Sequence, residues 1–130
     1  MRATKQSGQF LAGVRLFNAR KFFQAHEVWE ELWLAELQPE KSFLQGLIQL
    51  AAACHHHDRG NPRGARSLAT TGLAKLARFP DDHRGIALAE LCSEVDRWLE
   101  TLGGDGDLGA RKLPRIRLVA RSMRTKKPGG

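Results

Sequence analysis

The sequence has little cysteine and no long apolar run, and each shortage narrows its class. Of its 130 residues only two are cysteines, Cys54 and Cys92, each inside an apolar helical pattern and without metal-ligand spacing. We therefore interpret both as reduced core residues of a cytoplasmic protein. No apolar stretch of signal-peptide length follows the basic start, and none approaches the roughly 18 residues of a membrane span. The sequence thus predicts a cytoplasmic protein without a membrane partner.

Acidic residues are missing from the C-terminal part of the chain. The formal net charge is +7, but residues 108–130 hold eight basic residues and no acidic one, whereas residues 1–107 hold thirteen basic and fourteen acidic residues. The helical part is therefore nearly neutral, and its charge does not indicate nucleic-acid binding. The basic stretch predicts a weak contact with nucleic acid or acidic surfaces through residues 111–127.

Period-two alternation is also missing before residue 108, so a sheet is not expected. Apolar residues recur at helical spacing instead and predict five helices, at about 9–19, 22–37, 40–59, 62–78 and 86–102. The third is apolar over much of its circumference, as is typical of a central helix. Gly60-Asn61-Pro62 predicts the boundary before the fourth helix, because these residues suit a C-cap, an N-cap and a first helical position. The fold class is an all-α bundle around the third helix.

The chain is expected to form one domain with a C-terminal extension. The helical bundle covers residues 1–107. Residues 108–120 form an extended segment packed on the bundle, with its anchors at Leu113, Ile116 and Leu118. Residues 121–130 form a disordered basic tail, because they are too polar to bury apolar surface.

The segment AHEVWEELW carries the main polar constellation. His26 and Glu30 are four residues apart and share a helical face that also carries Trp33. Glu27 begins a second four-spaced pair, one residue further around the helix. If the second and third helices pack antiparallel, His26 and Glu30 approach His55, which continues the inner stripe of the third helix. Two histidines and a carboxylate then converge in apolar surroundings.

The HHHD run beginning at His55 resembles a metal tract. On a helix, however, consecutive side chains point about 100° apart and cannot converge on one ion. We expect His55 to belong to the constellation, with His56 as the second choice and His57 in solvent.

Three interpretations of His26, Glu30 and His55 remain open. They are a buried hydrogen-bonded network, a metal site or acid–base pair, or exposed and unrelated residues. Two histidines and one carboxylate can bind a transition metal such as zinc. Neither of two known metal motifs is present. Glu30 stands where both the H-E-x-x-H motif of zinc peptidases and the Glu-x-x-His motif of di-iron bundles require a histidine.

Three segments, FNARKFFQAHEVWEELW, FLQGLIQLAAACHH and RGNPRGA, stand out together. They closely resemble domain-of-unknown-function family 309 of bacteria and archaea, over about residues 17–80 and more weakly through the fifth helix to LPRIRL. The resemblance implies a compact all-helical bundle. It also implies a recurrent residue set, which maps onto His26, Glu27, Glu30, Trp33 and His55. The family has no established biochemical role, so no reaction is implied.

Two classes of function follow, and whether the protein is an enzyme stays open. In the first, the His/Glu cluster between the second and third helices binds metal or supports hydrolysis. In the second, the bundle is a non-enzymatic module that binds a partner, while the basic tail contacts nucleic acid or acidic surfaces. A cleft opening onto the cluster favours the first class, and an exposed apolar patch favours the second.

Overall fold

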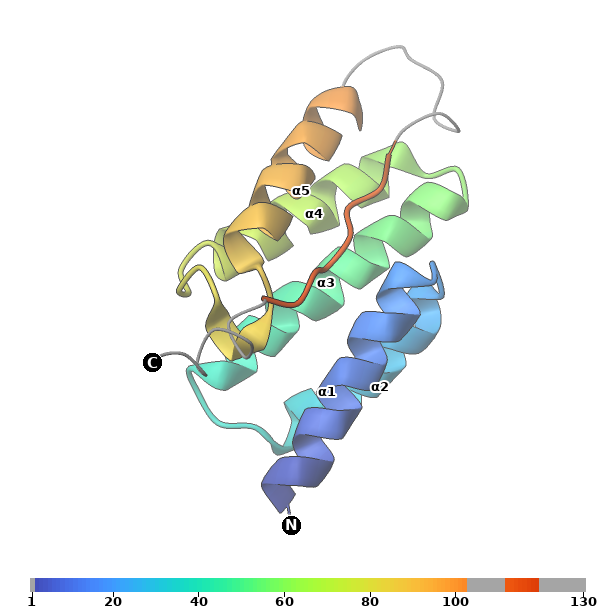
Figure 1. Cartoon of the computed structure of the whole chain (residues 1–130). Helices are drawn as coiled ribbons and strands as arrows, with labels where there is room; N and C mark the ends of the chain where they lie inside the picture. Colours follow the sequence, from blue (N-terminus) through green and yellow to red (C-terminus); the bar gives the residue numbers. More distant parts are fainter. Residues whose placement is uncertain (1, 103–111, 120–130) are drawn as a thin grey trace.

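The computed structural model describes residues 2–102 and 112–119. Within these ranges the chain forms five α-helices and one short 3-10 helix, and the predicted all-α class is confirmed (Figure 1). In chain order the elements are α1 (Arg2–Asn18), α2 (Phe22–Ala35), α3 (Glu40–Asp58), α4 (Pro62–Leu76), η1 (His83–Gly85) and α5 (Leu88–Leu102). As predicted, α3 is central: it packs against both α2 and α4, while α1 covers α2 and α5 covers α4.

The boundary between α3 and α4 forms as the local sequence predicts. Gly60 adopts a left-handed backbone with φ of 78°, which glycine tolerates without a steric cost. The side-chain oxygen of Asn61 accepts a hydrogen bond from the backbone N–H of Gly64 at 3.0 Å, and Pro62 occupies the first turn. The cap and the fixed proline φ together start α4 at this point.

Close backbone approaches define the core. A side chain at Gly72 of α4 would place its Cβ 2.8 Å from the backbone oxygen of Gly46 in α3. The absence of side chains at Gly46 and Gly72 therefore allows α4 to approach α3 closely. On the other side of α3, the aromatic part of the core consists of Phe10, Phe17, Phe22, Trp29 and Phe43.

The extended segment, residues 112–119, lies between α1 and α5 (Figure 1, red). The amide group of Asn18 in α1 donates to the backbone oxygen of Ile116 at 2.7 Å and accepts from its N–H at 2.8 Å. Leu113 and Ile116 are buried, as predicted, but Leu118 is 56% exposed. The backbone of Leu118 forms an antiparallel bridge with that of Ile86.

The predicted tail, residues 121–130, lies outside the described residues, as do residues 103–111. None of the helices in the described ranges is long and apolar enough to cross a membrane.

Candidate functional site

Helices α2 and α3 run antiparallel, as expected from their short connection. Beside the start of α2, Arg20 forms an ion pair with Asp58 at the end of α3, with 3.1 Å between Nη2 and Oδ1. At the other end, the ammonium group of Lys41 donates to the backbone oxygen of Trp33 at 2.6 Å. The start of α2 is therefore adjacent to the end of α3, where the sequence placed the candidate residues.

Two of the predicted histidines meet at an aromatic side chain that the sequence analysis did not single out. The ring of Phe23 stacks on the imidazole of His26, with 6.1 Å between centroids and an interplanar angle of 6°. The same ring lies 5.6 Å from the imidazole of His55. Phe23 itself is 52% exposed. We call these three residues, Phe23, His26 and His55, the Phe23 patch.

The carboxylates do not join this patch. Glu27 and Glu30 are exposed, and the structure records no hydrogen bond or ion pair between either of them and a histidine of the patch. Trp29 is fully buried. Glu30 is the next residue on α2, about 100° further around the helix, and it points outward. In the part of the chain that the structure describes, no three His, Cys, Asp or Glu residues are grouped so that they could hold a metal ion.

Trp33, the fourth residue of α2 in the predicted set, is half-buried between α2 and the start of α3. The ammonium group of Lys41 lies 4.0 Å from the centre of its ring, a cation–π contact. Its indole Nε1 and the Nδ1 of His26 are both shielded from solvent and have no hydrogen-bond partner within the described residues. The hydrogen-bonding capacity of the polar atoms on this face of α2 is therefore only partly satisfied within the described residues.

The prediction that His57 faces solvent is wrong. Its side chain is only 6% exposed, and its ring packs edge-on against Trp98 of α5 with 5.7 Å between centroids. The Nδ1 atom lies 3.7 Å from a carboxylate oxygen of Asp58, which is too long for a hydrogen bond. Because α3 is covered on several sides, the step of 100° from His56 moves the side chain of His57 under α5 rather than into solvent.

A second polar cluster joins residues far apart in the sequence and was missed for that reason. The Nε2 atom of His83 lies 3.0 and 2.9 Å from the two carboxylate oxygens of Glu40, which is 43 residues earlier. The guanidinium of Arg84 lies 3.5 Å from Glu40 and 3.9 Å from Glu36. No motif connects the pairs at 36–40 and 83–84. Only the Arg-Gly sequence at 84–85 hints at an unusual turn, and Arg84 has a left-handed backbone with φ of 60°.

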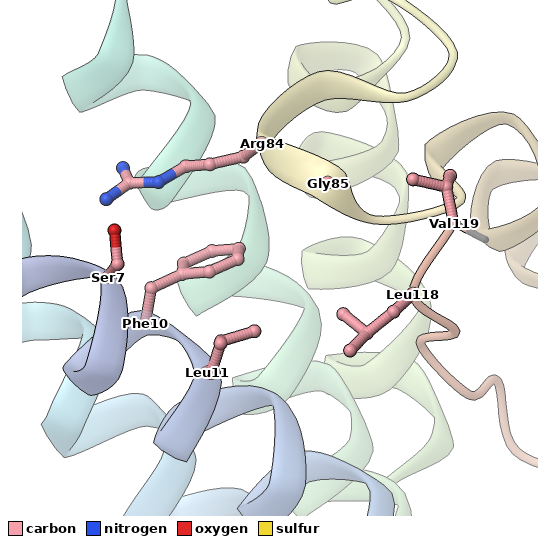
Figure 2. Close-up of a pocket in the computed structure, with 7 residues that line it drawn as sticks. All are labelled: Ser7, Phe10, Leu11, Arg84, Gly85, Leu118 and Val119. Carbon is pink, nitrogen blue, oxygen red and sulfur yellow. The ribbon is translucent and has the colours of Figure 1, made fainter. Parts of the chain in front are cut away.

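A cavity of about 280 Å³ opens beside this cluster (Figure 2). Arg84 and Ser7 lie at one end, and apolar side chains form the other. The full lining is Ser7, Phe10, Leu11, Arg84, Gly85, Leu118 and Val119. The Arg84 guanidinium lies 4.8 Å above the Phe10 ring. Because Glu36 and Glu40 already offset its charge, the cavity fits a small neutral acceptor better than an anion.

The two cysteines are free thiols in an environment that suppresses their reactivity. Burial, followed by the nearby Asp58 carboxylate, raises the pKa of the Cys54 thiol well above its usual value. Burial and the carboxylates of Asp96 and Asp81 also raise the pKa of Cys92. A catalytic cysteine needs a lowered pKa, because the thiolate is the nucleophile. Neither thiol has the electrostatic surroundings of such a residue.

These observations define the chain first as an all-α bundle protein, in which the candidate residues of α2 and α3 lie at a partly exposed surface. Comparison with known proteins then finds a family that part of the chain resembles. Residues 10–68 match the family described as "Domain of unknown function (DUF309)". The match runs from α1 into α4, confirms the resemblance over this region and includes the whole Phe23 patch.

Two curated relatives share this similarity, and both are longer than the matched region. The chain is 35% identical over 86 residues to an "Uncharacterized protein" of Aquifex aeolicus (strain VF5), covering 65% of this chain and 26% of the relative. It is 32% identical over 98 residues to the "Uncharacterized protein YpuF" of Bacillus subtilis (strain 168), covering 68% of this chain and 55% of the relative. The chain thus spans about a quarter and about half of their lengths.

Proposed function

We propose that this protein is a non-enzymatic interaction module that binds a partner protein through the Phe23 patch. The observation that carries the proposal is the half-exposed ring of Phe23, held between the imidazoles of two helices. Exposed aromatic side chains on a rigid support are typical anchors of protein interfaces. All members of the family residue set lie on this α2–α3 side of the bundle, and none of them belongs to the fully buried core.

The partner's chemistry follows from the exposed carboxylates that share α2 with Phe23. Glu27, Glu30 and Glu31 are exposed along the outer face of α2. Glu31 accepts a hydrogen bond from Gln9 at 2.9 Å, so its charge is not neutralised. An apolar ring beside several negative charges complements a segment with one apolar side chain flanked by lysines or arginines. We therefore expect a basic amphipathic segment of another protein to cover Phe23.

Site-specific cross-linking tests this proposal. A photoreactive phenylalanine analogue replaces Phe23 in the cells that make the protein, and a second version carries it at Thr70, an exposed position on α4. We expect one discrete cross-linked product from position 23 only. The product should disappear in a Glu27→Lys/Glu30→Lys background, because the charge complementarity is reversed. The same products from both positions, or a product unaffected by the charge reversal, would refute the proposal.

A metal-binding or hydrolytic role of His26, Glu30 and His55 is the second candidate. Two observations favour it: both imidazoles contact the same ring, and Nδ1 of His26 has no hydrogen-bond partner within the described residues. Imidazole nitrogens bind zinc well, but Glu30 does not approach them. Elemental analysis of protein purified without a histidine tag separates the candidates. One equivalent of a transition metal, lost in His55→Ala, would establish the metal site instead.

The basic stretch at residues 111–127 provides a second proposed contact, with nucleic acid or acidic surfaces. Part of its charge is already used, because Arg117 forms ion pairs with Glu90 and Glu94 of α5 at 3.0 and 2.5 Å. Lys112 and Arg115 are exposed and remain at the surface. Both cysteines are free, which fits the reducing cytoplasm as the proposed location.

A further inference from the structure

A basic cavity lies between the α1–α2 turn and the extended segment. Its volume is about 230 Å³. Three cationic residues, Arg20, Lys112 and Arg115, line it, and no carboxylate does so among the described residues. The rest of the lining is Phe17, Asn18, Phe22, Leu113 and Pro114. Asp58 pairs with Arg20, so the net positive charge of the site comes from Lys112 and Arg115. Together with the apolar lining, this charge favours an anionic ligand.

The backbone that carries these cations is held in place. Arg20 is fixed by its ion pair with Asp58 at 3.1 Å, yet its side chain remains 59% exposed. The backbone N–H of Arg115 donates to a carboxylate oxygen of Glu94 at 2.9 Å. The side chain of Asn18 forms hydrogen bonds with both the N–H and the carbonyl oxygen of the next residue, Ile116. The Arg115 side chain is therefore presented to solvent from a fixed backbone. Such preorganisation lowers the entropic cost of binding.

A second cavity, of about 260 Å³, continues the basic surface. It shares Lys112 and Leu113 with the first cavity and adds Arg97. Its one carboxylate, Glu94, is already engaged by Arg117. Positive charge therefore extends from Arg20 across the extended segment to α5. A single small anion would use only part of this surface, whereas a polymer with repeated phosphates would use all of it.

We propose that these two adjoining cavities, which we call the basic double cavity, bind the phosphate backbone of a nucleic acid. Three residues of extended chain span about 10 Å, so the side chains of Lys112 and Arg115 can contact neighbouring phosphates along one strand. Phe17 and Phe22 are buried, at 1% and 3% exposure, and cannot stack on bases. Recognition is therefore of the backbone, independent of base sequence.

This inference rests on the proposed contact through residues 111–127 and assigns it to described residues of the folded domain, including Arg20 and Arg97 outside that stretch. It uses none of the three residues of the Phe23 patch, because neither cavity is lined by Phe23, His26 or His55.

Fluorescence anisotropy with a labelled 24-base-pair DNA duplex, at 50 to 200 mM salt, tests the proposal on the full chain. The cavity variant is Lys112→Gln/Arg115→Gln. The matched control is Lys75→Gln/Arg78→Gln, in the last turn of α4 and just after it. Both variants lose two positive charges. We expect the cavity variant to weaken binding about tenfold or more at low salt and to reduce the logarithmic salt slope by about two. The control should change the Kd less than about twofold, and circular dichroism should show both variants folded.

A third variant separates the inference from the proposed contact on which it rests. It changes Arg121, Arg124, Lys126 and Lys127 to glutamine in the full chain. If only this variant loses binding, the contact through 111–127 stands and the basic double cavity is refuted. If the unchanged protein does not bind the duplex at all, both are refuted. Saturation by inorganic phosphate or displacement by poly-glutamate as effective as by unlabelled duplex would also refute nucleic acid as the ligand.

Discussion

Gly13 lies in α1 where the indole ring of Trp29 packs directly against the helix backbone. Trp29 is fully buried, and its Nε1–H donates to the backbone oxygen of Phe10 at 3.1 Å. A Cβ atom at position 13 would lie 2.5 Å from Cε2 and 2.6 Å from Cδ1 of this ring, and closer still to Nε1. Carbon atoms in contact need about 3.5 Å or more. In Gly13→Ala, either the ring or α1 must therefore move.

The expected loss of stability follows from three contributions. Overpacking a well-packed core costs about 1–3 kcal/mol, and a buried indole N–H left without its acceptor costs about 1–3 kcal/mol. Alanine offsets part of this, because it is more favourable than glycine inside a helix by about 0.5–1 kcal/mol. We expect Gly13→Ala to lower the free energy of unfolding by about 2–4 kcal/mol.

The matched control is Gly8→Ala in the same helix. Nothing lies within 4 Å of a Cβ at this position, so only the helix preference acts, and stability should rise by up to about 1 kcal/mol. Urea denaturation followed by circular dichroism at 222 nm measures both variants against the unchanged protein. The two substitutions should shift stability in opposite directions. A Gly13→Ala protein as stable as Gly8→Ala would show that Trp29 does not pack on α1 as described.

Three further experiments test other parts of the structure. Leu47→Asp should abolish folding in circular dichroism because Leu47 is fully buried, whereas Ile48→Asp should leave a folded protein because Ile48 is only partly buried. Equal damage from both would refute the orientation of α3. Burial raises the pKa of the Cys54 thiol in the folded chain. Above about pH 8.5 this thiol therefore ionises in the unfolded chain but stays protonated in the folded one. As the pH rises, Cys54 should thus lower the free energy of unfolding by about 1.4 kcal/mol per pH unit. In denaturation from pH 8 to 10.5, Cys54→Ala should remove this alkaline dependence, and Cys92→Ala should remove less of it, because its thiol is only partly buried. Parallel pH profiles for all three proteins would contradict the assignment. Asn18→Ala should speed amide exchange in the extended segment, because both hydrogen bonds to its backbone are lost, and unchanged exchange would show that other contacts hold it.

Local sequence determined the helices and most of their limits. The Gly60-Asn61-Pro62 boundary needs only backbone preferences and one short-range cap, so it could be predicted without knowing any neighbouring helix. Other limits were less local. The first helix begins at Arg2 rather than near residue 9, and the fifth begins at Leu88 because Ile86 is extended and bridges to Leu118. The apolar period gave the number of helices correctly but did not reveal this pairing.

Helical spacing also predicted which candidate residues share a face, but not which faces are covered. His26 and His55 do come to one patch, as antiparallel packing requires. Glu30 and His57 did not follow the expectation of an inward carboxylate and an outward histidine. A period of 3.6 residues fixes the angle between side chains, whereas burial depends on the number of helices that surround each one. For His57 that neighbour is Trp98 of α5, and nothing near position 57 in the sequence encodes it.

Contacts between distant segments were decided by the tertiary structure alone. His83 reaches Glu40 only because the α4–α5 connection returns to the start of α3. In the same way, Arg20 and Arg115 line one cavity because the chain after α5 returns along α1, where Asn18 holds it. The sequence by itself determined the helices, their inner faces and the uneven distribution of charge. Which charges gather into a site depended on the path of the chain between helices, because that path is selected by packing of the whole core rather than by any local preference.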